Sequence, residues 1–94
     1  MRVNIKLFHI ENARAIRQGN PRSDHTTNCP LALAIEEKLG KAVHVHPTTG
    51  TVCMDKEPIL HMSPRVVQWA EAFDAGKPVG PAIFQLREVQ SDLA

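Results

Sequence analysis

The stretch Cys29-Pro30-Leu31-Ala32-Leu33-Ala34-Ile35-Glu36-Glu37-Lys38-Leu39-Gly40 defines one helix at both of its ends. Pro30 suits the first helical turn, where a backbone N–H has no partner within the helix. Gly40 can adopt the left-handed conformation that commonly ends a helix. The stretch therefore predicts a helix that begins just after Cys29. Its apolar side is expected to carry Leu31, Ala34, Ile35 and Leu39.

Apolar spacing predicts the elements on either side of this helix. Alternation over residues 3–7 predicts a strand, and the spacing over residues 9–18 predicts a short helix, followed by a polar loop over residues 20–28. After Gly40, a hairpin over residues 43–55 and a strand over residues 59–62 are expected.

Ser63-Pro64 combines a capping hydroxyl with a proline at the first helical position, so it predicts the start of another helix. Trp69 and Phe73 lie on the apolar side of this helix and are expected to supply the largest share of the core. Gly76 is expected to end the helix, and residues 81–86 to form the last strand.

The resulting order β-α-α-β-β-β-α-β predicts an α+β fold in a single domain over residues 1–94. We expect a small antiparallel or mixed sheet of four to five strands, with two main helices packed on one face.

The composition is that of a folded globule, because 43% of the residues are hydrophobic and 22% are charged. No apolar run approaches the roughly 20 residues that a membrane span needs, and the N-terminus lacks the apolar block of a signal peptide. We therefore expect a cytoplasmic protein without a membrane partner. In a reducing compartment, Cys29 and Cys53 are expected to stay unpaired.

Cys29 is the first residue to weigh for chemistry. A cysteine at a helix N-terminus can have a lowered thiol pKa. A catalytic thiol also needs a base, however, and none of the histidines forms a recognisable local signature with Cys29. The residue types favour a structural role for Cys29, with a reactive thiol as the alternative.

A metal site is the second possibility. His44 and His46 lie two residues apart on an expected strand, so both point to the same face. The spacings differ from the paired ligands of structural zinc sites. We therefore assign no metal ligand and no cofactor, and leave open whether His44, His46 and Cys53 bind a metal. Further ligands for such a set could come from His25, Cys29 and His61.

Arg14, Arg17 and Arg22 are a candidate interaction surface on the first helix and the loop after it. Arginine side chains match phosphate geometry, so the three could contact a nucleic acid. The formal net charge is only +1 and no aromatic stacking platform accompanies the arginines. These features disfavour nucleic acid and favour a solvated helix face.

Several short motifs, taken in order, resemble a group of small uncharacterised proteins encoded by tailed bacteriophages and prophages. The resemblance implies a setting and no particular activity. The motifs are His9-Ile10, Gly19, Asn28-Cys29-Pro30-Leu31-Ala32-Leu33-Ala34, Ser63-Pro64, Phe73-Asp74-Ala75-Gly76-Lys77-Pro78-Val79 and Pro81-Ala82-Ile83-Phe84-Gln85-Leu86.

No catalytic set, nucleotide-binding glycine loop or paired carboxylate motif is found in the sequence. The leading hypothesis is a non-enzymatic phage-type accessory protein that binds a protein partner or a second copy through a sheet edge. The alternatives are a nucleic-acid-binding accessory protein that uses the arginines, and a small metal- or thiol-dependent enzyme.

Overall fold

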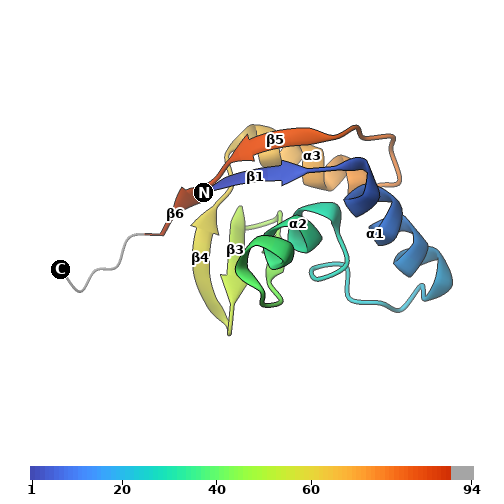
Figure 1. Cartoon of the computed structure of the whole chain (residues 1–94), viewed down its shortest axis with the longest axis horizontal. Helices are drawn as coiled ribbons and strands as arrows, with labels where there is room; N and C mark the ends of the chain where they lie inside the picture. The colour runs from blue at the N-terminus through green and yellow to red at the C-terminus, as the bar shows by residue number, and fades with distance from the viewer. Residues whose placement is uncertain (90–94) are drawn as a thin grey trace.

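The structure, a computed structural model, describes residues 1–89, so residues 90–94 of the expected domain lie outside it. No helix within residues 1–89 has the length and apolar character to cross a membrane. Figure 1 colours the chain from blue at the N-terminus to red at the C-terminus. The described elements are β1 (Arg2–Ile5), α1 (Leu7–Gly19), α2 (Pro30–Leu39), β2 (His44–His46), β3 (Thr51–Met54), β4 (Glu57–His61), α3 (Pro64–Asp74), β5 (Ala82–Gln85) and β6 (Arg87–Glu88).

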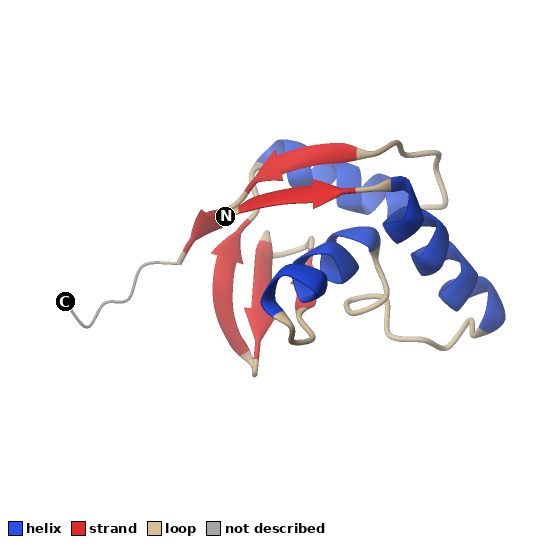
Figure 2. Cartoon of the chain, in the orientation of Figure 1, coloured by secondary structure: helices blue, strands red, loops and turns tan. Residues whose placement is uncertain are grey.

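The strands form two antiparallel sheets, and the helices pack around them (Figure 2). One sheet pairs β1 with β5, and the other has the order β2-β3-β4-β6. Helix α2 packs against α1, β1 and β2. This arrangement confirms the α+β class and the expected order of elements.

The division into two sheets differs from the single sheet that we expected, and the reason lies at Leu86. This residue separates β5 from β6, and its side chain is fully buried. Its backbone N–H still donates to the Met1 carbonyl beside β1, over 2.7 Å. The next residue, Arg87, already pairs with His61 of β4. The extended segment from β5 to β6 therefore pairs first with one sheet and then with the other.

The core is mainly aliphatic. The largest fully buried side chains include Ile5, Leu31 and Ile35, which come from β1 and α2. Phe73 is buried as expected, but Trp69 is only half-buried, so the expectation that both dominate the core is wrong for Trp69. Its indole N–H donates to the Gly80 carbonyl over 3.2 Å, and this bond keeps the ring near the surface.

Helix α2 follows the sequence prediction at both ends. Cys29 is the N-cap, with its sulfur accepting the Ala32 N–H over 3.3 Å. Gly40 ends the helix with a φ of 72°, in the left-handed region. The apolar side differs at Leu39, which is 38% exposed, because the last helical turn extends past the core.

Helix α1 begins earlier than expected, at Leu7, because Lys6 acts as its N-cap. The Lys6 backbone N–H donates to His9 Nδ1 over 2.9 Å, which ends β1 at Ile5 and turns the chain into the helix. Leu7, expected on the strand, is 54% exposed at the start of the helix.

The buried face of α1 does not coincide with the apolar residues of this helix. Ile10 and Ala13 are buried, and Arg17 continues their i, i+3, i+7 spacing, so its side chain is only 13% exposed. Ile16 falls outside this face and is 39% exposed.

Candidate functional site

The Cys29 thiol is a structural group in this fold. Its residue is 4% exposed, and burial raises the pKa of the thiol to about 11. The expected lowering by the helix N-terminus is therefore outweighed, although the hydrogen bond from Ala32 acts in that direction. A thiol with this pKa stays protonated near neutral pH, and the thiolate is the reactive form. Cys29 therefore caps α2 with a thiol that is in its less reactive, protonated form near neutral pH.

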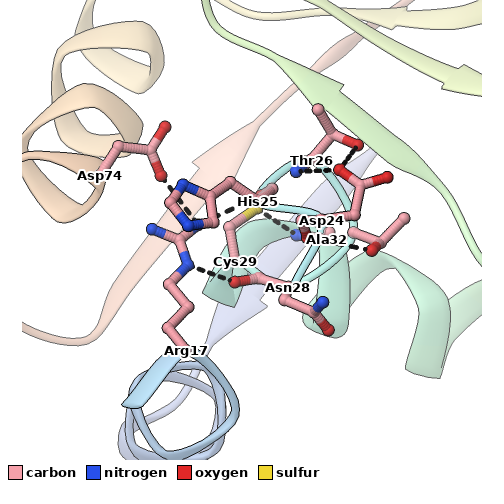
Figure 3. Close-up of polar contacts among 9 residues, drawn as sticks. Arg17, Asp24, His25, Thr26, Asn28, Cys29, Ala32 and Asp74 are labelled. Atoms are coloured by element: carbon pink, nitrogen blue, oxygen red, sulfur yellow. Dashed lines mark hydrogen bonds and ion pairs between the residues drawn. The ribbon is translucent and has the colours of Figure 1, made fainter. Parts of the chain in front are cut away.

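Arg17 is held by four contacts on the inner side of α1, three of them drawn in Figure 3. Its guanidinium pairs with the Asp74 carboxylate over 2.8 Å and donates to the carbonyls of Asn28 and His25, over 2.8 Å and 3.1 Å. It also lies 4.5 Å from the centre of the Phe73 ring. These contacts engage Nε and Nη2, so they occupy part of the donor fork that would otherwise face a phosphate.

The other two arginines diverge from each other. Arg14 donates to the Lys77 carbonyl over 3.2 Å and lies 5.2 Å from the centre of the Phe73 ring. Arg22 is exposed in the loop after α1. The expected solvated face is therefore wrong for Arg17. The structure brings Arg14 and Arg17 together on one aromatic ring and leaves Arg22 apart from them.

The loop between α1 and α2 is fixed around Asp24 and Thr26. The Thr26 hydroxyl and N–H both donate to Asp24 Oδ1, and the hydroxyl also lies 2.8 Å from His44 Nδ1. The hydrogen bonds from Thr26 lower the pKa of Asp24 from its ordinary value. The Thr26 carbonyl accepts the Val45 N–H over 2.9 Å, so the loop covers the free edge of β2.

His44, His46 and Cys53 do meet on one face of the β2–β3 hairpin. His44 and Cys53 are cross-strand partners, and the two imidazole rings stack with their centres 6.2 Å apart. All three line a pocket with a volume of about 620 Å³. Within residues 1–89, however, no group of three or more histidine, cysteine or acidic side chains is placed to hold a metal ion. Of the other candidates, Cys29 is buried in the core, and His61 lies one strand further across the sheet, opposite Thr51.

A second depression, which sequence reasoning missed, lies between α1 and α2. This α1–α2 groove has a volume of about 660 Å³. Phe8 and Ile16 on its α1 side are 44% and 39% exposed, and Leu33 lines it from α2. Asn12 and Ala15 complete the α1 side. Apolar side chains that remain exposed around a concave surface mark a binding site more often than scattered ones do.

His9 and Glu37 form a polar pair at this groove. His9 is 4% exposed; its Nδ1 accepts the Lys6 N–H, and its Nε2 lies 2.6 Å from Glu37 Oε2. An Nδ1 that accepts must be unprotonated, so the ring proton is on Nε2 and is donated to Glu37. The imidazole is therefore neutral, and the carboxylate, 57% exposed, keeps its negative charge.

The sequence contains one signal for this groove. Phe8, Asn12, Ala15 and Ile16 recur at helical spacing outside the set that is buried with Ile10. A helix packed on a core needs only one apolar face, so a second apolar face indicates a surface available to a partner. The pairing of His9 with Glu37, which lie far apart in the sequence, has no local signal.

Comparison of this chain with protein-family models, with curated proteins and with solved structures finds no match. The resemblance to small phage proteins stays a prediction from the sequence.

Proposed function

We propose that this protein is a non-enzymatic binding module that holds a protein partner in the α1–α2 groove. The observation that carries the proposal is the exposure of Phe8 and Ile16 on the open, mainly apolar groove between the two helices. Burying such side chains under a partner is worth about 25 cal/mol for each Å² of apolar surface removed from water. In the setting that the sequence resemblance implies, the partner is a bacterial host protein or a phage protein in the cytoplasm.

The chemistry of the groove supports binding over catalysis. Both ring nitrogens of His9 are engaged, one by the Lys6 N–H and the other by Glu37, so neither is free to take a proton from a substrate. The Cys29 thiol is buried and its pKa is raised to about 11. These facts favour the binding module over a thiol-dependent enzyme.

The nucleic-acid alternative has weaker support, because the guanidinium of Arg17 already contacts Asp74 and two backbone carbonyls. Breaking these contacts to reach a phosphate would leave the Asp74 carboxylate without its cation.

A partner that binds at a sheet edge is the other alternative. An experiment can distinguish it from a partner in the groove, since Ile83 of β5 is also exposed, at 54%.

The test compares Ile16→Ser with Ile83→Ser, which remove matched exposed side chains from the groove and from β5. Each tagged protein is incubated with a bacterial lysate, and the retained proteins are quantified by mass spectrometry. The proposal expects one stoichiometric protein that wild type and Ile83→Ser retain and Ile16→Ser loses. Loss in Ile83→Ser alone would move the site to the sheet edge. Retention of nucleic acid in place of a protein would overturn the proposal.

A further inference from the structure

We propose that the occupant of the α1–α2 groove is an amphipathic helix with a basic polar face. This inference rests on the proposed function and specifies the chemistry of the partner. Its first support is the shape of the groove. The α1 side presents Phe8, Asn12 and Ile16, which are four residues apart, and the α2 side presents Leu33 and Gly40. Side chains at this spacing form the ridges and grooves into which a third helix packs.

The length of the groove also fits a helix. Phe8 and Ile16 lie eight residues apart on α1. At a rise of about 1.5 Å per residue, they are separated by about 12 Å along the axis. That distance corresponds to about two helical turns, so apolar anchors at positions i, i+4 and i+7 of a partner helix would span it.

An extended peptide fits this surface less well. The groove is walled by two helices, whose backbone groups bond along their own axes, so it offers no row of free N–H and C=O groups for strand pairing. A peptide helix satisfies its own backbone and needs from the groove only apolar contact and charge. Because its walls offer no free backbone hydrogen-bonding groups, the groove favours a helical peptide over an extended one.

The charges around the groove specify a basic partner. The charged residues that line it are Glu36 and Glu37, and its lining includes no lysine or arginine. The Glu37 carboxylate is 57% exposed and His9 beside it is neutral, so His9 does not cancel its negative charge. The nearest cations, Arg2, Lys6 and Lys38, lie outside this lining, in the adjoining depression that Glu37 also borders.

A second copy of this chain is a poor occupant of the groove. A symmetric pair of grooves would bring Glu36 and Glu37 of one copy against the same residues of the other, which is unfavourable. The cationic side chains of α1 cannot compensate, because Arg14 and Arg17 are turned toward Phe73 and the carbonyls around it.

The test uses a pair of blocked peptides of about twelve residues, enough for three helical turns. Both carry leucine at i, i+4 and i+7, and their polar positions are all lysine in one peptide and all glutamate in the other. Affinity for the whole protein is measured by fluorescence anisotropy, and the bound surface by amide chemical shifts. We expect the lysine peptide to bind about tenfold more tightly, from two exposed charge pairs, and to shift the amides of α1 and α2.

The matched variants are Glu36→Gln with Glu37→Gln, and Glu71→Gln as the control on the exposed side of α3. A glutamine at position 37 can still accept the His9 proton, so the double change removes charge and keeps the hydrogen bond. We expect it to abolish the preference for the lysine peptide, and Glu71→Gln to preserve it. If the double variant does not fold, the peptide affinities of wild type are measured at high salt instead. Screening of the glutamate charges should then remove the preference for the lysine peptide.

The outcomes separate this inference from the proposed function. Equal binding of both peptides, abolished by Ile16→Ser, overturns the basic partner and leaves the groove as the binding site. Capture of a protein from lysate that depends on Ile16, with neither peptide bound, overturns the helical occupant alone. Self-association that Ile16→Ser abolishes overturns the heterologous partner. Failure of both peptide binding and capture overturns the inference and the proposed function together.

Discussion

The two faces of α1 reverse the usual relation between residue type and burial. On the inner face, Arg17 continues the line of Ile10 and Ala13 into the structure, with its side chain 13% exposed. On the outer face, Phe8 and Ile16 remain exposed at the α1–α2 groove. Arg17, which was expected on a solvated face, packs inside the fold, and the apolar side chains of Phe8 and Ile16 remain accessible to a partner.

The largest expected effect is on the aromatic ring beneath the inner face. Phe73→Ala should lower the free energy of unfolding by about 3–5 kcal/mol, because the ring is 3% exposed and supports the guanidinium groups of Arg14 and Arg17. Trp69→Ala should have a smaller effect, because Trp69 is half-buried. Urea denaturation of both variants measures the difference. A larger loss in Trp69→Ala would restore the tryptophan as the main core aromatic.

Arg17→Ala should lower the free energy of unfolding by about 3 kcal/mol, because it leaves the Asp74 carboxylate and two carbonyls without their donor. Arg22→Ala is the matched control, and we expect it to change stability by less than about 0.5 kcal/mol. Chemical denaturation of the two variants distinguishes them. Equal, small effects would show that Arg17 belongs to a solvated face after all.

The Cys29 thiol gives a pH-dependent test of the same buried side. Its pKa is raised from 9.0 to about 11, so the native state favours the protonated thiol. The resulting stability is fully present below pH 9.0 and is lost as the pH rises toward about 11. We expect a loss on the order of 2 kcal/mol in wild type relative to Cys29→Ser, which keeps a capping oxygen and does not titrate. Parallel denaturation profiles of the two proteins over this pH range would contradict the buried thiol.

A second pH-dependent effect is expected at Asp24, in the loop that Thr26 fixes. Hydrogen bonds from Thr26 lower the pKa of Asp24 below 3.8, so the stability from its ionised form is present above this pH and is lost as the pH falls further. The advantage of wild type over Asp24→Asn should therefore shrink below pH 3.8. Thermal melts of both proteins across this range measure it, and a constant difference would refute the role of the charge.

Local sequence signals predicted the ends of α2 well. Cys29, Pro30 and Gly40 act through backbone conformation within one or two residues, so their roles do not depend on distant parts of the chain. The α+β class and the order of elements followed from spacing in the same way. The start of α1 was harder to predict, because its N-cap, Lys6, is not a residue type that usually caps a helix.

The candidate site was less predictable, because tertiary contacts decide it. Arg17 is held in place by Asp74, which lies far along the chain on α3. The negative charge beside His9 comes from Glu37, which lies on α2. The pKa of Cys29 likewise follows burial by neighbours, and this outweighed the effect of the helix N-terminus. Residue type and local spacing contain none of this information.

We propose that the outer face of α1 binds a partner and contributes little to stability. Ile16→Ser tests this through two readouts, its free energy of unfolding and its capture of the protein that wild type retains from lysate. We expect a stability within about 1 kcal/mol of wild type and a loss of capture, since Ile16 is 39% exposed. A stability loss as large as that of Arg17→Ala, with capture unchanged, would show that Ile16 supports the fold and not binding.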